Sequence, residues 1–368
     1  MSGLTAAAPA DASPHRLAGA WRYARRSPVI VVTVLCVALI VTATIAATIG
    51  AAGIPLPRLM AAAGLTVGDP ALIERDRLVL WSIRLPRIAM SCMIGAMLAA
   101  AGTIMQGLFR NPLAEPGLVG VSAGAALAAA STIVLGDRIL AGTGIVLPFA
   151  ALPIAAFVGA LVTTAILYRF ATREGRTSIA TLLLAGLAIG ALAQAAIGLL
   201  IFMADDRQLR DITFWTLGSL SGSTWGKAGA IAPFLLILLL SLPFIVNGLD
   251  LMVLGEAEAF HMGVAVERLK RAAIVLVAAA AGASVAFAGI IGFVGIVVPH
   301  LLRLSLGPGH RVLLPASLCF GAILLLAADT VARVLVAPAE LPVGIVTAAI
   351  GAPFFLALLM RQRALVGP

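Results

Sequence analysis

Hydrophobic residues occur along this chain in long unbroken runs, and not in alternation with polar residues. Gly, Pro and short charged stretches separate the runs. Many runs reach the roughly 20 residues that an α-helix needs to cross about 30 Å of hydrocarbon. A spanning strand of a β-barrel would instead alternate apolar and polar residues. The pattern therefore predicts an all-α polytopic membrane protein, because a helix satisfies its own backbone hydrogen bonds in lipid.

Glycine, proline and charged residues divide the chain into about ten predicted transmembrane helices. The seventh and eighth are the hardest to separate, because "FAGIIGFVGIVVPH" offers no polar break between them. An even number of spans places both termini on one side of the membrane. The predicted spans are residues 28–52, 86–107, 117–136, 145–168, 178–203, 226–247, 272–289, 290–306, 314–337 and 343–360.

The first run could also be the apolar segment of a signal peptide. It is too long for that segment, which covers about 7–15 residues, and the basic "WRYARRSP" before it also suits a membrane anchor. We therefore interpret residues 28–52 as the first span. Residues 1–27 are then an Ala-rich cytoplasmic tail, expected to be disordered, and residues 28–368 form the transmembrane domain.

Composition agrees with a membrane protein. The chain is 61% hydrophobic and 11% charged, with a mean hydropathy of +1.11, whereas soluble domains are roughly 45–50% apolar. The net charge of +9 suits anionic lipid, and no soluble basic domain with stacking aromatics indicates nucleic-acid binding. Cys36, Cys92 and Cys319 lie in apolar runs. They are expected to act as small hydrophobic residues, so neither a disulfide nor a metal site is predicted.

The distribution of basic residues predicts the orientation. With the N-terminus inside, the cytoplasmic segments hold more than half of the 25 Lys and Arg, as the positive-inside rule requires. Basic residues in the opposite loops dilute this bias and need another explanation, notably Arg84, Arg87, Arg207, Arg210 and Arg333.

The stretch "LGEAEAFHMGVAVERLKR", residues 254–271, is charged although it lies between two long apolar runs. In the predicted topology it is cytoplasmic. Its acidic residues come first and its basic residues last, which suits the dipole of a helix. Leu254, Ala257, Met262 and Val266 give one weakly apolar side, and Gly263 is a point where two short helices could meet at an angle. Two interpretations remain open: a solvated connector, or a docking surface for a cytoplasmic partner.

Several motifs together resemble the FecCD-type permeases of ABC importers, which take up iron chelates, heme and cobalamin. "GEAEAFHMG" is similar to the cytoplasmic coupling loop of ABC-importer permeases, and the other motifs follow the family's order over roughly residues 81–360. The resemblance implies a type II ABC-importer permease fold. The motifs are "RLPR" at 84–87, "QGLFRNPLAEPGLVGVSAGA" at 106–125, "WTLGSLSGSTW" at 215–225, "GFVGIVVPHLLR" at 292–303, "HRVLLP" at 310–315 and "ADTVARVLVAPAELPVGIVTAAIGAPFF" at 328–355.

This resemblance implies a transport subunit of the bacterial inner membrane, without enzyme activity or cofactor. The sequence has no "GxxxxGK[ST]" motif to cradle nucleotide phosphates, so a separate subunit must hydrolyse ATP. The implied partners are a second copy of the permease, two cytoplasmic ATPase subunits, a periplasmic substrate-binding protein and membrane lipid. The coupling loop near 248–271 would contact the ATPase through Gly255, Glu256, Ala257, Glu258, Ala259, His261, Met262 and Gly263.

By the same resemblance, Arg84, Arg87 and Arg333 are expected to be exposed on the outer face and to dock acidic residues of the binding protein. A guanidinium group binds carboxylates well because it is always charged and donates in a fork. Two other interpretations stay open. The arginines could extend to the membrane interface, or Arg333 could pair with Asp329, one helical turn before it.

Small residues at 120–124 ("GVSAG") and 186–190 ("GLAIG") are expected to let helices pack closely within the chain. The family's translocation path would correspond to residues 181–194 and 346–355, which are mainly apolar. Met203, Met262 and His300 could suggest heme ligation, but His300 beside a proline is more typical of packing, so no heme site is predicted.

Three functions were compared. A secondary carrier would place ionisable residues at mid-membrane for ion coupling, and Asp329 alone approaches that position. A structural or assembly protein has no use for both a coupling loop and outer arginines. The ABC-importer permease is therefore favoured. The sequences "NPLAEPGLVGVSAGAAL" and "APAELPVG" are most similar to those of the heme-importing branch. Cobalamin or a ferric siderophore is the alternative cargo.

Overall fold

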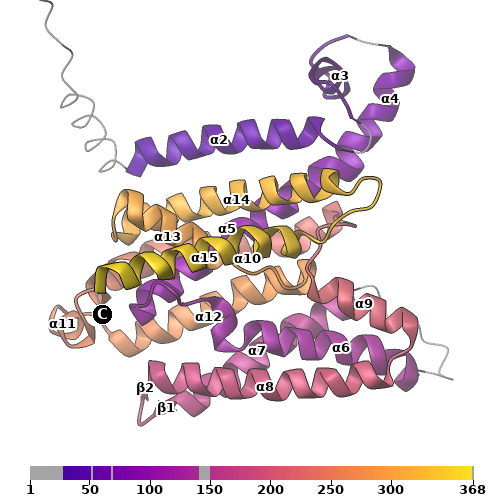
Figure 1. The fold of residues 1–368 in the computed structure, drawn as a ribbon. Helices are drawn as coiled ribbons and strands as arrows, with labels where there is room; N and C mark the ends of the chain where they lie inside the picture. Colours follow the sequence, from indigo (N-terminus) through magenta and orange to yellow (C-terminus); the bar gives the residue numbers. More distant parts are fainter. Residues whose placement is uncertain (1–27, 51–52, 68, 141–149, 367–368) are drawn as a thin grey trace, which may run out of the picture.

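The computed structural model describes residues 28–50, 53–67, 69–140 and 150–366. Within them lie ten long, mostly apolar helices, packed side by side (Figure 1). Each overlaps one predicted span, so the all-α fold class is confirmed. The helices are α2 (Pro28–Thr48), α5 (Leu85–Phe109), α6 (Val121–Leu140), α7 (Ala151–Ala171), α8 (Ile179–Met203), α10 (Trp225–Met252), α12 (Val266–Ala288), α13 (Val294–Leu306), α14 (His310–Leu335) and α15 (Val343–Val366). The predicted tail 1–27, residues 51–52 of the first predicted span and residues 145–149 of the fourth lie outside the described residues.

Short elements between the long helices were not predicted. The second span starts well before residue 86, because α4 and a π-helical turn lead into α5 without a break. Helix α9 is amphipathic and begins with a capping box, in which the side chains of Asp205 and Gln208 each bond the other's backbone N–H. The additional elements are α3 (Leu56–Ala62), α4 (Pro70–Leu78), η1 (Val79–Arg84), η2 (Pro116–Val119), α9 (Asp206–Thr216), α11 (Glu256–His261), β1 (Thr172–Arg173) and β2 (Arg176–Thr177).

Helix α5 forms the centre of the bundle. Nearly all of its residues are buried, and it packs against α10, α12, α13 and α14. Glycines allow two of these contacts to bring backbones together. A methyl group on Gly95 would overlap the carbonyl oxygen of Gly321 on α14, and one on Gly102 would overlap the carbonyl of Gly295 on α13. Such close approaches are typical of helix packing in membranes.

The two small-residue motifs have different surroundings. Side chains at Gly120 and Gly124 would overlap Thr163 on α7, so the predicted close packing of "GVSAG" is confirmed. Gly190 of "GLAIG" has no atom of another residue within 4 Å of an added methyl group. Close packing within the chain is therefore wrong for Gly190.

The break between α12 and α13 corrects the eighth predicted span. Helix α12 ends at Ala288, and an irregular segment of five residues, 289–293, leads to α13. The end of α12 packs on the chain before α10: Ser219 N–H donates to the carbonyl of Ala288 at 2.7 Å. Helix α13 has only 13 residues, or about 20 Å at 1.5 Å per residue. It is therefore too short to cross about 30 Å of hydrocarbon alone.

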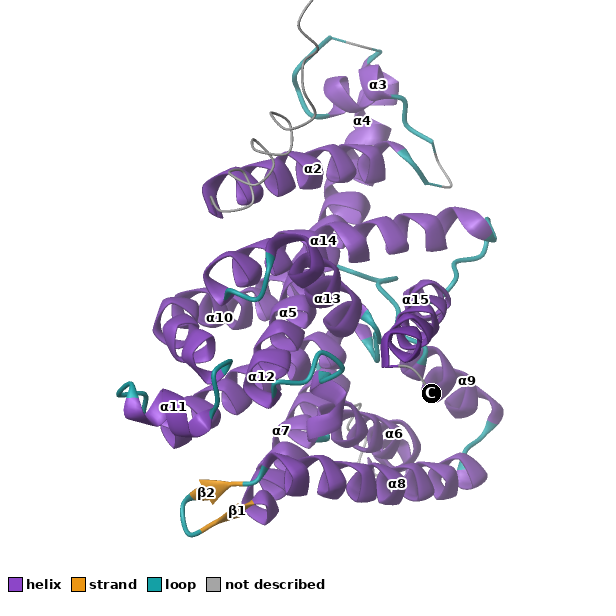
Figure 2. Ribbon diagram, turned by 60° about the vertical axis from the view of Figure 1, so that its left-hand side comes forward, coloured by secondary structure: helices purple, strands orange, loops and turns teal. Residues whose placement is uncertain are grey.

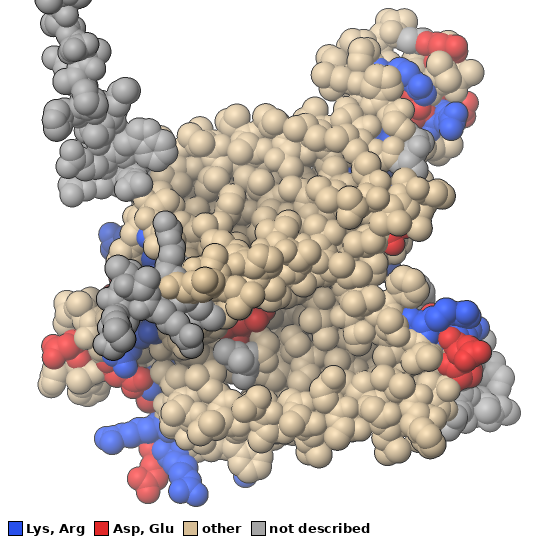
Figure 3. Space-filling view, viewed as in Figure 1, with Lys and Arg blue, Asp and Glu red and all other residues tan. Residues whose placement is uncertain are grey.

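On the face shown in Figure 3, the charged side chains gather at the two ends of the bundle, and the surface between them is largely uncharged. Helix α11, the β1–β2 hairpin and the end of α15 lie at one end, with the start of α2 (Figure 1). Helices α3, α4 and α9 lie at the opposite end. An uncharged band between charged ends is the surface that a bilayer requires.

Candidate functional site

The predicted coupling loop forms a compact unit at one end of the bundle. Helix α10 continues to Met252, α11 covers Glu256–His261, and α12 starts at Val266. Gly255 and Gly263, with φ of 125° and 90°, stand on either side of α11. Both angles disfavour residues with a side chain, so these two glycines fix the turns into and out of α11. The sequence suggested that two short helices meet at Gly263. The helix that follows Gly263 is instead the long helix α12.

The surface of this unit is apolar as well as charged. Leu254, Phe260 and Met262 are 62%, 67% and 59% exposed, and we call these three residues the coupling tip. Ala257, Glu258 and His261 are also exposed, whereas Ala259 is buried. Val266, predicted from the sequence to lie on the apolar side, is buried, and the exposure of Phe260 was not predicted. Grouped apolar side chains exposed to water mark interaction sites.

Glu256 differs from Glu258 because it is already paired. Its Oε2 lies 2.7 Å from Nζ of Lys270 on α12, and the Lys270 side chain is 2% exposed. Lys270 also contacts Oε1 of Glu267 at 3.1 Å and donates to the carbonyl of Thr177 at 3.1 Å. Glu256 therefore holds α11 against the bundle, and Glu258 is the acidic side chain of α11 that faces outward.

The arginines expected on the outer face are buried. Arg84, Arg87 and Arg333 are 4%, 8% and 8% exposed. Arg87 Nη2 lies 2.8 Å from Oδ1 of Asp329, and its Nη1 lies 2.9 Å from Oε1 of Glu340. The expectation of exposed arginines is thus wrong. The sequence could not show this, because Arg87 and its two carboxylates are 242 and 253 residues apart.

Arg333 and Arg84 are also held inside the chain. Nε of Arg333 lies 3.3 Å from Oδ2 of Asp329, which confirms the expected pair within α14. Nη2 of Arg333 is 3.4 Å from the carbonyl of Ala46 on α2, and Arg84 donates to the carbonyl of Ala47. Both guanidinium groups are buried within the chain. Glu340, with its side chain 43% exposed, is the accessible member of this ion-pair cluster.

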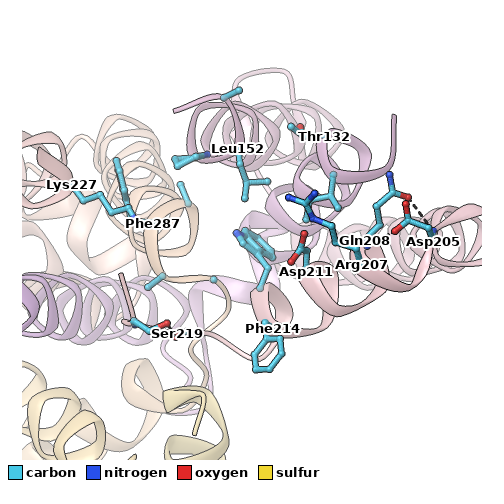
Figure 4. Close-up of a pocket in the computed structure, with 18 residues that line it drawn as sticks. Thr132, Leu152, Asp205, Arg207, Gln208, Asp211, Phe214, Ser219, Lys227 and Phe287 are labelled. Atoms are coloured by element: carbon cyan, nitrogen blue, oxygen red, sulfur yellow. Dashed lines mark hydrogen bonds between the residues drawn. The ribbon is translucent and has the colours of Figure 1, made fainter. Parts of the chain in front are cut away.

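A cavity of about 670 Å³ opens at the end opposite to α11. Figure 4 shows Arg207, Gln208 and Asp211 of α9, with the N-cap residue Asp205, at one side of it. Lys227 and Phe287 lie across from them. Acidic, basic and aromatic side chains therefore line the same cavity. The sequence analysis noted Arg207 only as an unexplained outer charge. The capping box of α9 is the sequence signal that could have indicated a helix here.

The residues considered for heme ligation do not form a site. Met203 ends α8 and Met262 follows α11, at opposite ends of the bundle (Figure 1). His300 is buried in α13, with its ring 6.1 Å from that of Phe354, as expected for a packing residue. Among the described residues, no three His, Cys, Asp or Glu side chains are grouped as metal ligands.

Glu115 is a partly buried carboxyl group for which the sequence predicted no role. It lies in the loop between α5 and α6 and is half-buried. Burial raises the pKa of Glu115, and a hydrogen bond from the backbone N–H of Phe293 opposes that rise. This contact joins the loop after α5 to the start of α13.

The parts of α8 and α15 expected along the path present apolar side chains. On α8, Leu184, Leu187 and Leu192 are 69%, 75% and 70% exposed, and Ile350 on α15 is 50% exposed. These surfaces have no cover within the described part of the chain. They suit contact with lipid, with a second protein, or with an apolar substrate.

Comparison with known proteins decides the family. The model of the FecCD transport family matches residues 32–361. This chain belongs to the FecCD transport family. The resemblance found in the sequence is confirmed, and the protein is an ABC-importer permease and a multi-pass protein of the inner membrane.

Relatives within the FecCD family carry different cargoes. The hemin transport system permease HmuU of Yersinia pestis is 45% identical over 294 residues, covering 77% of this chain and 83% of the relative. The cobalamin import permease BtuC of Halobacterium salinarum is 43% identical, covering 84% and 80%. The vitamin B12 import permease BtuC of Serratia proteamaculans is 41% identical, covering 79% and 84%.

A solved structure supports the assigned FecCD fold. It is described as a metal-chelate type ABC transporter in an inward-facing conformation. Its TM-score to this chain is 0.78 at 31% identity, covering 90% of this chain and 98% of the other. The ten-helix architecture is therefore that of an ABC type II importer permease.

Proposed function

We propose that this FecCD permease forms the path of a binding-protein-dependent importer that carries heme across the inner membrane. The 45% identity to a hemin permease supports this cargo over cobalamin, for which the relatives reach 43%. Because the margin is small, cobalamin is the alternative, and a ferric siderophore is the next. Transport assays in proteoliposomes with the cognate binding protein should give ATP-dependent heme uptake. Uptake of cobalamin without uptake of heme would exclude heme as the cargo.

The coupling tip carries the proposal of an ATPase partner. It consists of three exposed apolar side chains on or next to α11, the short helix at the end of the bundle (Figure 1). The proposed docking unit is the set Gly255, Glu256, Ala257, Glu258, Ala259, His261, Met262 and Gly263, with Phe260 added. In this unit the exposed side chains make contact, while Glu256 fixes the position of α11.

Replacing Phe260 with Ala should weaken ATPase binding by about tenfold or more, because truncating a buried aromatic anchor at an interface costs about 2 kcal/mol or more, and about 1.4 kcal/mol is tenfold in affinity. Glu258→Lys should weaken binding less. The measurement is the affinity of the ATPase for the permease in lipid discs. Leu240→Ala on α10, also highly exposed but within the apolar band, is the control. Equal affinity for Phe260→Ala and the control would exclude the coupling tip as the docking surface.

We also propose that the permease is a two-fold dimer with its termini in the cytoplasm. One chain offers one coupling tip, whereas two ATPase subunits that enclose nucleotide between them need two. The uncovered apolar faces of α8 and α15 support a path at the dimer axis. Native mass measurement in detergent is expected to give two permeases with two ATPases. A single permease with two ATPases would contradict the dimer.

The outer arginines remain the proposed docking site for the binding protein, with a change in how they act. Since Arg87 is occupied by Glu340 and Asp329, an acidic side chain of the binding protein would have to replace Glu340. The exposure of Glu340 supports such an exchange, while Asp329, 1% exposed, would stay in place.

A further inference from the structure

Lys270 stands at a junction of three segments at the end of the bundle where α11 lies. Its Nζ contacts Glu256 on α11 at 2.7 Å, Glu267 on α12 at 3.1 Å and the carbonyl oxygen of Thr177 at 3.1 Å. The side chain is 2% exposed. One buried ammonium group thus donates to acceptors on three different parts of the chain. A lysine has three N–H donors, so all of them are used.

The third of these segments leads directly into α8. Thr177 belongs to β2 of the β1–β2 hairpin, which lies beside α11 at this end (Figure 2). Its N–H donates to Oε2 of Glu267 at 3.1 Å. The next residue, Ser178, caps α8 by accepting a hydrogen bond from the N–H of Thr181. Both backbone groups of Thr177 are therefore fixed to the Lys270–Glu267 pair, one residue before the cap of α8.

The hairpin itself is short, and hydrogen bonds close it at its base. Thr172 pairs with Thr177 and Arg173 with Arg176, and the Thr172 and Thr177 hydroxyls lie 3.1 Å apart. Ser178 N–H closes the base by donating to the carbonyl of Ala171 on α7 at 2.9 Å. A shift at Thr177 therefore reaches α8 without passing through a flexible linker.

We infer that Lys270 is a positioning residue that couples movement of α11 to the start of α8. This inference rests on the proposed function, in which α11 receives the ATPase and α8 borders the path. Displacing α11 carries Glu256 with it, and the buried lysine transfers that displacement to Thr177. Charged groups hold such a joint well because their hydrogen bonds are short and strong, and separating them in a buried site leaves a charge unpaired.

The test is a distance measurement between spin labels on the two copies of the permease, bound to its co-purifying ATPase in lipid discs. One pair is attached at Glu174 in the hairpin turn and a second pair at Val253 before α11, after Cys36, Cys92 and Cys319 have been replaced by Ala. In the wild type, ATP is expected to change both distances. In Lys270→Met the change at Val253 should persist, and the population that shifts at Glu174 should fall by about fivefold.

Arg268→Met is the matched control, because Arg268 lies on the same turn of α12 and is exposed. It should preserve both distance changes. If Lys270→Met does not assemble, Glu256→Gln keeps the shape of the joint, removes its ion pair and should reduce the change at Glu174 in the same direction. An undiminished change at Glu174 in either variant overturns the inference. Failure of the wild-type permease to bind ATPase would instead overturn the proposed function, and the inference with it.

Discussion

Replacing Gly321 on α14 with Leu is expected to prevent the permease from folding. An added Cβ at this position overlaps the carbonyl of Gly95 and the Cβ of Ala99 on α5. Both are parts of a packed helix and cannot rotate away. Even Gly321→Ala should cost about 1–3 kcal/mol through overpacking. Size-exclusion profiles of the Leu variant in detergent should show aggregate, and the Ala variant should unfold at a lower temperature than the wild type.

Gly229→Ala on α10 is the control for this prediction. An added methyl group there meets no atom within 4 Å, and alanine favours a helix over glycine by about 0.5–1 kcal/mol. The unfolding temperature of this variant should therefore equal or exceed that of the wild type. If Gly321→Ala and Gly229→Ala unfold at the same temperature, α5 and α14 are not in close contact.

The long helices could be predicted because a long apolar run that crosses a bilayer must form a helix. Hydropathy predicted ten spans, and each overlaps a helix. The predicted start of the eighth span was wrong, because hydropathy stays high through residues 289–293 although the backbone is not helical there. That break depends on contacts with Trp215 and Gly218, more than 70 residues earlier, and no local pattern contains it. The short helix α9 was missed because it is polar overall and lies outside the spans.

The exposed position of the charged loop between α10 and α12 could be predicted for the opposite reason. A charged stretch between two apolar runs must leave the membrane, so its place follows from "GEAEAFHMG" alone. Which of its glutamates is exposed could not be predicted. Glu256 and Glu258 look equivalent in the sequence, and the difference arises because Lys270 is buried beneath Glu256. A Glu256→Lys substitution would place two ammonium groups together, so it would test folding as much as docking.

The same limit applies to the outer arginines. Their positions in "RLPR" and "ADTVAR" carry the family resemblance, but a motif does not specify burial. Only Asp329 could be linked to Arg333, since the two are four residues apart in one helix. Glu340 enters the cluster through the loop between α14 and α15, whose path is set by tertiary contacts such as Leu341 N–H to the carbonyl of Ala332 at 3.2 Å.

Arg87→Gln is expected to abolish docking of the binding protein and to destabilise the permease. It removes the guanidinium that an acidic partner would use, and it leaves Asp329 buried with Arg333 at 3.3 Å as its remaining cation. Breaking a buried pair on one side costs about 3–5 kcal/mol. The affinity of the binding protein for the permease in lipid discs and the unfolding temperature in detergent are the two measurements. A loss of docking alone could follow from misfolding, so a second variant is needed.

Arg87→Gln with Asp329→Asn separates the two effects. Without Arg87, two carboxylates, Asp329 and Glu340, share Arg333 as their cation. Removing the Asp329 charge leaves one charge of each sign, Arg333 and Glu340, and should recover part of the stability, while docking should stay lost. Glu340→Gln should act in the other direction. It frees one fork of Arg87 and should strengthen docking by about two- to fivefold, the value of one exposed ion pair, with a steeper loss of affinity as salt rises. If the double variant docks like the wild type, or if Glu340→Gln weakens docking, Arg87 serves only to hold α5, α14 and the following loop together.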